Sequence, residues 1–241
     1  KILTNEELSK TVDTSDEWIV ARTGIKQRHI ADESELTSDL ATKACQDLFK
    51  NSKVQAKDIE LIIVATTTPD LTFPSTATII QDKIKAKNAF AFDVQAVCSG
   101  FVYALTIANN FISSGQVKNA IVIGAETLSR IVDWKDRNTC VLFGDGAGAV
   151  LLEATNDQNR GILSTKLCSD GSLTDILKTT GGASFNKSSG FIEMAGKEVF
   201  KHAVTKMSDV VYESLESAGL TVDDIDVLVP HQANIRILDS V

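Results

Sequence analysis

The chain has 241 residues, of which 43% are hydrophobic and 23% charged, and its formal net charge is −8. This length and composition suit a globular protein with one large domain or two similar lobes. The negative charge argues against a general nucleic-acid or membrane surface, and apolar runs such as "LIIVA" are far too short to span a bilayer.

The cysteines indicate free thiols. They stand at positions 45, 98, 140 and 168, without the spacing of a metal knuckle or a redox motif, and only three histidines accompany them. We therefore expect no metal site. Free thiols are typical of a reducing compartment, so the sequence predicts a cytoplasmic protein.

In chain order, the first distinctive segment is residues 14–30, which holds Trp18, Arg22 and Arg28. An aromatic ring with arginines can stack on a base and bind phosphates, although a solvated helix end has the same pattern. The elements that follow are a helix, turn and strand over 38–65, a helix at 75–87, a strand at 89–97, a helix after Cys98, and strands at 120–124, 141–143 and 149–152. This alternation predicts a largely parallel sheet covered by helices.

Residues 208–233 resemble residues 38–65. Each segment contains an amphipathic helix, a polar turn and an Asp-Ile pair that leads into an apolar strand, at offsets of 166 to 170 residues. The second copy is preceded by an apolar strand at 161–168 and ends soon after "DVLVPH" and a helix from Asn234. We infer a duplication with lobes at 1–157 and 158–241, in a chain incomplete at both ends. An asymmetric natural protein is the alternative.

Cys98 lies where a buried strand turns into a helix. A helix N-terminus offers unpaired N–H groups and a positive dipole end, which stabilise a thiolate, and Gly100 leaves room for a substrate. These features favour a nucleophile, whereas a lone cysteine between apolar residues is commonly a small core residue. Cys45, Cys140 and Cys168 are interpreted as packing residues.

His231 ends an apolar strand, which is where parallel sheets hold their reactive groups. Its alternative is a histidine bonded to backbone; His29 and His202 are interpreted as surface residues. The segment "FGDGAGAV", at 143–150, is a weak match to a dinucleotide loop, because a strand rather than a helix follows it. We expect a tight turn near the reaction centre there.

Four motifs together resemble a known family. The segments "DTSDEWIVARTGI", "FDVQAVCSGFVYAL", "FGDGAGA" and "VPHQANIRI" are similar to those of the β-ketoacyl-acyl carrier protein synthase III family, and the likeness covers nearly the whole chain. The resemblance implies the thiolase fold, with two duplicated α/β lobes in a layered αβαβα arrangement. It also implies decarboxylative condensation of an acyl-CoA primer, expected to be acetyl-CoA, with malonyl-acyl carrier protein.

The same resemblance assigns roles to residues. Cys98 accepts the acyl group and His231 is the catalytic histidine, with no cofactor beyond the CoA thioester substrate. Trp18 and Arg137 enclose the adenine, Arg22 contacts a phosphate, and Gly196 and Asn234 line the pantetheine tunnel. Phe73 reaches into the acyl pocket of a second subunit, which implies a homodimer. The family's third catalytic residue, an asparagine in a Gly-Asn-Thr-Ser-type loop, has no counterpart here.

A basic face is expected to receive the acidic carrier protein. Lys197 and Lys201 share a helix face, Lys206 lies near it, and Arg236 matches a family residue for carrier docking. Solvated lysines are the alternative. Other functions left open are a cysteine hydrolase, an inactive partner subunit and a related condensing enzyme with another acyl substrate.

Overall fold

Two sets of residues each fold around a core of their own. The computed structural model describes residues 1–157 and 160–241. The first unit comprises Lys1–Ile30, Leu128–Gly144 and Leu163–Val241, and the second comprises Ala31–Thr127 and Asp145–Ile162. The predicted lobe boundary between residues 157 and 158 falls at the gap, outside the described residues, and stays a prediction.

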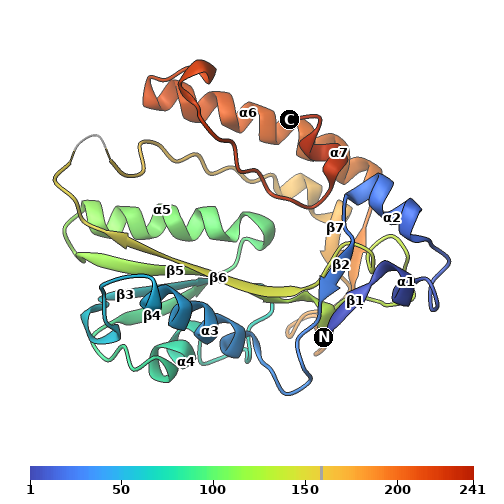
Figure 1. Cartoon of the computed structure of the whole chain (residues 1–241), viewed down its shortest axis with the longest axis horizontal. Helices are drawn as coiled ribbons and strands as arrows, with labels where there is room; N and C mark the ends of the chain where they lie inside the picture. The colour runs from blue at the N-terminus through green and yellow to red at the C-terminus, as the bar shows by residue number, and fades with distance from the viewer. Residues whose placement is uncertain (158–159) are drawn as a thin grey trace. The chain divides into compact units, whose positions relative to one another are not determined.

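The second unit is an α/β layer structure (Figure 1). Its sheet has the strand order β4-β3-β5-β6, in which β3 pairs in parallel with β4 and β5, and β6 is antiparallel to β5. Helices α3 and α4 cover one face and α5 covers the other. The elements are α3 (Thr37–Lys50), η1 (Ala56–Asp58), β3 (Leu61–Ala65), α4 (Thr76–Lys83), β4 (Phe90–Val94), η2 (Val97–Ser99), α5 (Gly100–Ser113), β5 (Asn119–Thr127) and β6 (Asp145–Glu153).

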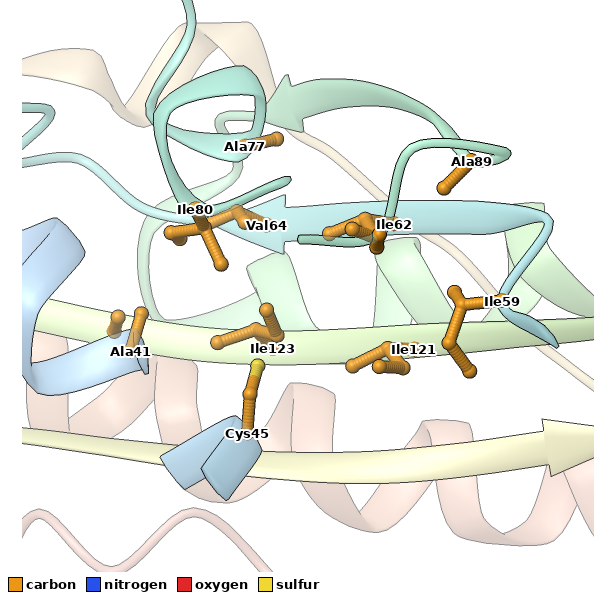
Figure 2. Packing of buried hydrophobic residues seen from close by; sticks show 12 residues of the cluster. Ala41, Cys45, Ile59, Ile62, Val64, Ala77, Ile80, Ala89, Ile121 and Ile123 are labelled. Atoms are coloured by element: carbon orange, nitrogen blue, oxygen red, sulfur yellow. The ribbon is translucent and has the colours of Figure 1, made fainter. Parts of the chain in front are cut away.

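The central strand β3 explains why "LIIVA" is uniformly apolar. Its five residues are all buried, because alternate side chains enter cores on opposite faces of the sheet. Ile62 and Val64 pack with α3 and α4, where Cys45 extends toward Ile123 of β5 (Figure 2). Cys45 is a packing residue as predicted, and burial raises the pKa of its thiol to about 12. Each buried isoleucine contributes about 1.5–3 kcal/mol.

The first unit is built from short elements. Two antiparallel strand pairs, β1 with β2 and β7 with β8, join helices around an apolar cluster that includes Ile19, Val132 and Cys140. Cys140 is thus a core residue, as predicted. The elements are β1 (Ile2–Thr4), α1 (Asn5–Leu8), α2 (Asp16–Thr23), β2 (Gln27–His29), η3 (Leu128–Arg130), η4 (Gly171–Ile176), β7 (Leu177–Thr179), β8 (Ile192–Met194), α6 (Gly196–Ala218), η5 (Val222–Asp224) and α7 (Ile235–Leu238).

The two resembling segments share a local structure. Each has a helix followed by a 3₁₀ turn, η1 or η5. In the first turn Asp58 Oδ2 accepts from the N–H of Gln55 at 3.3 Å, and in the second Asp224 Oδ2 accepts from the N–H of Thr221 at 2.8 Å. The acid shared by the two copies therefore closes the same kind of turn in each.

Several predicted strands are wrong. Residues 141–143 form a turn whose apolar side chains enter the first unit's core, and 161–168 and 226–231 have no ladder partner among the described residues, so neither is a strand. Val227 and Val229 are accordingly about three-quarters exposed. Cys168 is exposed rather than packed in a strand. The glycines of "FGDGAGAV" lie mostly in β6, where a turn was expected.

Candidate functional site

Cys98 lies at the carboxyl end of the parallel strands, in the connection from β4 to α5. It is the middle residue of the 3₁₀ turn η2, and the α-helix α5 begins two residues after it, at Gly100. Val97, immediately before it, has φ of +48°. This left-handed conformation is an outlier for a β-branched residue, and such strain gathers at functional turns. The thiol is therefore carried on a sharply bent backbone.

Two glycines let the start of α5 lie close to the sheet. A Cβ on Gly100 would come within 3.2 Å of Ala65 Cβ at the end of β3, and a Cβ on Gly124 of β5 would come within 3.4 Å of the Phe101 ring. The Gly-Phe pair that begins α5 is thus explained by packing: the helix approaches the sheet where side chains are smallest. This contact fixes the position of the turn that holds Cys98.

The electrostatics of Cys98 differ from the expectation for a helix N-terminus. Cys98 is an exposed residue, yet the protein around its sulfur raises the pKa of the thiol. Burial is the larger cause, the negative charge of Glu126 adds to it, and the backbone N–H of Cys98 opposes it. The predicted stabilisation of a thiolate is therefore outweighed, and Cys98 favours the protonated form.

His231 belongs to the first unit and lies in a non-regular segment just before α7. Asn234 caps that helix, because its Oδ1 accepts from the N–H of Arg236 at 2.9 Å. The helix is held against the end of α2, where Gly24 leaves space for Ile235. His231 is an exposed residue, yet desolvation of its ring by the surrounding protein lowers the pKa of the imidazole, so the neutral form is favoured.

A pocket of about 610 Å³ lies within the first unit. Six residues that the sequence singled out line it: Trp18, Arg22, Gly196, Lys197, Asn234 and Arg236. Its size lies in the range of small-molecule and cofactor pockets. The elements α2, α6 and α7 meet around it, and apolar side chains such as Met194 and Phe200 supply much of its wall.

Two arginines surround the indole ring of Trp18. The guanidinium carbon of Arg22 lies 4.4 Å from the ring centroid and that of Arg137 lies 5.1 Å from it. Arg137 also donates to the backbone oxygen of Asp13 at 2.9 Å. An aromatic face with two planar cations can stack on a base and bind phosphate, which is the chemistry expected of this segment.

The helix α2 is held in place by a buried polar network. Arg28, of which 3% is exposed, donates through Nε and Nη2 to the oxygen of Val141 and through Nη1 to Asn5 Oδ1. Asn5 in turn donates to Asp16, the first residue of α2, at 2.7 Å. Arg28 is therefore a structural residue that supports the pocket wall rather than a ligand-binding one.

The remaining predicted residues are on the surface. Lys197 and Lys201 are exposed on α6, and only Lys197 lines the pocket. Arg236 lies over the ring of Phe200, at 5.5 Å from its centroid. Phe73 belongs to the second unit and is 83% exposed.

Sequence reasoning missed Glu126. It is the penultimate residue of the strand "AIVIGAET", and its carboxylate accepts from the N–H of Thr67 at 2.8 Å and from the hydroxyl of Thr68 at 2.5 Å. Burial raises the pKa of its carboxyl. An acid at the end of an otherwise apolar strand was the available signal, since a half-buried carboxylate is costly unless it is hydrogen-bonded.

Two family models match the chain. Residues 92–171 match 3-oxoacyl-(acyl-carrier-protein) synthase III, and residues 215–241 match its C-terminal part. The first match contains Cys98 and the second contains His231.

Curated relatives cover the whole chain. The beta-ketoacyl-(acyl-carrier-protein) synthase III of Ehrlichia chaffeensis is 60% identical over 241 residues, which are 100% of this chain and 76% of that protein. The enzyme of the same name from Wolbachia pipientis wMel is also 60% identical, with the same shares of coverage.

A solved structure agrees with both. The crystal structure of 3-oxoacyl-(acyl-carrier-protein) synthase III from Aquifex aeolicus VF5 has a TM-score of 0.93 and 48% identity, covering 100% of this chain and 75% of that one. The fold is the thiolase fold, and the chain spans about three-quarters of the length of these relatives. The chain belongs to the β-ketoacyl-acyl carrier protein synthase III family.

Proposed function

We propose that this chain condenses an acyl-CoA primer, expected to be acetyl-CoA, with malonyl-acyl carrier protein, and so starts fatty acid synthesis as an acyltransferase. The observation that carries the proposal is 60% identity over the whole chain to enzymes of that name. The bent strand-to-helix turn at Cys98 supports it independently, because this turn presents a thiol at the reactive end of a parallel sheet.

Cys98 is the proposed nucleophile of the first half-reaction. The thiol gives up its proton, a bond forms from Sγ to the carbonyl carbon of the acyl-CoA, and the carbon–sulfur bond to CoA breaks. CoA leaves as its thiol, taking up a proton, and an acyl-enzyme remains. A thiol of high pKa yields few thiolates at neutral pH, but each is intrinsically more nucleophilic than one of low pKa.

His231 is assigned to the second half-reaction. Malonyl-acyl carrier protein loses CO₂, and the electrons of the broken carbon–carbon bond form an enolate. A neutral imidazole can donate a hydrogen bond to its oxygen without readily protonating the carbanion, and burial favours the neutral form of His231. The carbanion attacks the acyl carbon on Cys98, and the carbon–sulfur bond breaks to regenerate the cysteine.

The pocket of the first unit is the proposed CoA site. The adenine would stack on Trp18, with Arg137 leaving the indole to cover its other side, and Arg22 would bind a phosphate. Gly196 and Asn234, which line the same pocket, would border the pantetheine arm. No cofactor is required beyond this thioester.

Three further assignments extend the proposal. Phe73 is 83% exposed, which suits a residue that enters the acyl pocket of a second subunit in a homodimer. Lys201 and Arg236 are proposed to dock the acidic carrier protein. No helix among the described residues is both long and apolar enough to cross a bilayer, and the free thiols favour the cytoplasm.

Radiolabelling tests the proposed function. Incubation with labelled acetyl-CoA, followed by peptide mapping, should place the acyl group on Cys98, and Cys98→Ala should abolish labelling and condensation. Cys168→Ala is the matched control, because Cys168 is also exposed and forms no disulfide. A label on another cysteine would refute the assignment, and release of free acid in place of a β-ketoacyl thioester would identify a hydrolase.

A further inference from the structure

Glu126 forms the centre of a hydrogen-bond cluster at the carboxyl ends of β3, β4 and β5. Its two oxygens accept from the N–H of Thr67 and the hydroxyl of Thr68, which belong to the loop that follows β3. No lysine or arginine in the described ranges forms an ion pair with this half-buried carboxylate. Its charge is thus balanced by loop groups alone.

The loop Thr66–Thr68 is hydrogen-bonded to the ends of both neighbouring strands, β4 and β5. The N–H of Thr66 donates to the oxygen of Val94 at 3.2 Å, and Gln95 Nε2 donates to Thr67 Oγ1 at 3.0 Å, which ties the loop to the end of β4. Thr68 Oγ1 accepts from the N–H of Thr127 at 2.8 Å, which ties it to β5. Glu126 therefore supports the segment on which the connection from β4 to Cys98 rests.

A short path of contacts leads from this loop to the thiol. Ala65, which directly precedes the loop, is the residue against which Gly100 packs, and Gly100 is two positions after Cys98. The charge of Glu126 also acts on the Cys98 thiol directly and raises its pKa. The other acids at this end of the sheet, Asp70 and Asp93, accept N–H groups of Ser38 and of Thr76 and Ala77 at the starts of α3 and α4.

We propose that Glu126 is a positioning residue for Cys98: its carboxylate holds the Thr66–Thr68 loop against the end of β4 and so supports the strand-to-helix turn that carries the thiol. Its negative charge also opposes ionisation of the thiol. This inference rests on the proposed role of Cys98 as nucleophile. The benefit is chemical. A thiol kept protonated resists oxidation and alkylation while the site is empty, and its thiolate, once formed, attacks a thioester more strongly than a stabilised one.

The Glu126→Gln variant tests the effect of the carboxylate charge on Cys98 while the shape of the side chain is kept. The amide keeps the size of the side chain and can still accept the N–H of Thr67, but it carries no charge. The rate of Cys98 alkylation by iodoacetamide is measured against pH, with the alkylated peptide identified by mass spectrometry. We expect the profile to move to lower pH, with alkylation at neutral pH faster by roughly threefold or more. Glu126→Ala should show the same movement and, in addition, slower acylation by acetyl-CoA because the loop loses its anchor.

Glu60→Gln is the matched control. Glu60 also accepts a backbone N–H, that of Lys118 at 2.7 Å, but lies at the opposite end of β3 and β5. Its variant should leave the alkylation profile unchanged. Repeating the series in His231→Ala protein removes titration of the proposed partner imidazole.

An alkylation profile of Glu126→Gln that coincides with that of the unmodified protein, or moves to higher pH, would overturn the inference, even if stability falls. Failure of acetyl labelling at Cys98 would instead refute the proposed function, so the two failures are distinguishable.

Discussion

Burial favours the neutral form of both proposed catalytic groups, the thiol of Cys98 and the imidazole of His231. Burial raises the pKa of the thiol and lowers that of the imidazole. A protonated thiol and a neutral imidazole each suit the proposed enolate chemistry, because neither group is a strong acid that would quench a carbanion.

His231→Ala should separate the two half-reactions. Acylation of Cys98 by acetyl-CoA should persist, whereas decarboxylation of malonyl-acyl carrier protein should fall about 100- to 1000-fold, the usual effect of losing one oxyanion donor. Single-turnover labelling and CO₂ release measure the two steps. Equal loss of both steps would make His231 the base for Cys98 instead.

The same residue gives a pH dependence. Because folding lowers the pKa of His231 from its ordinary value of 6.5, protonation favours the unfolded chain. The stability contributed by neutral His231 is present above pH 6.5 and is lost as pH falls through the lowered pKa. Decarboxylation should decline over the same acidic range. The control is His202→Gln, which replaces a histidine of α6. In this variant decarboxylation should still decline over the same acidic range.

At the scale of elements, the position of α5 decides where the thiol lies. The helix approaches β3 and β5 only because Gly100 and Gly124 carry no side chain, and the loop held by Glu126 supports the same contact. Arg28 has a comparable effect in the first unit, where it joins β2, α1 and the turn at Val141 next to α2. Each of these proposed reactive or ligand-binding groups is thus positioned by a neighbour that has no proposed part in the reaction.

Gly100→Val should push α5 away from β3. The new side chain would meet Ala65 at the end of the strand, and overpacking of this kind costs about 1–3 kcal/mol of unfolding free energy. Urea denaturation measures the loss, and acetyl labelling of Cys98 should slow. Gly146→Val is the control, because a Cβ added at Gly146 would have no heavy atom within 4 Å.

Combining Gly100→Val with Ala65→Gly should recover part of the stability, since the clash involves those two residues. If Gly100→Val costs no more than Gly146→Val, the close approach of α5 is not a constraint.

At the scale of the whole molecule, charge is the feature that bears on carrier docking. The chain carries −8, so an acidic carrier is repelled except where cations gather. Lys201 is exposed on α6 and does not line the pocket, whereas Arg236 does. Lys201 therefore offers the cleaner test of carrier docking. A substitution of Arg236 is expected to weaken the binding of CoA substrates as well.

Lys201→Glu should slow association with malonyl-acyl carrier protein at low ionic strength, and the difference from the unmodified protein should shrink as salt is added. Acylation by acetyl-CoA should be unchanged. Lys87→Glu is the control, because it changes the net charge by the same amount but lies in the second unit. This variant should leave the kinetics with malonyl-acyl carrier protein near those of the unmodified protein. Identical effects of the two substitutions would show that total charge, not a docking face, governs association.

The sequence by itself determined the family, the α/β class and the order of elements in the second unit. Its signals are local: an unbroken apolar run for β3, helical spacing for α5, and an Asp-closed turn that recurs after 166 residues. Packing residues such as Cys45 and Cys140 were also identified correctly, because a cysteine in an apolar periodic pattern is commonly buried.

Only the tertiary structure decided which apolar segments pair as strands and which polar groups lie near one another. Residues 141–143 look like a strand, but whether an extended apolar segment finds a ladder partner depends on chain far away in sequence. The raised pKa of Cys98 likewise comes from burial in the fold and, secondly, from the charge of Glu126, which lies 28 positions further along the chain and is brought near by the sheet. Burial and charge act through space, so the environment of the thiol followed from the fold and not from the residues that flank it.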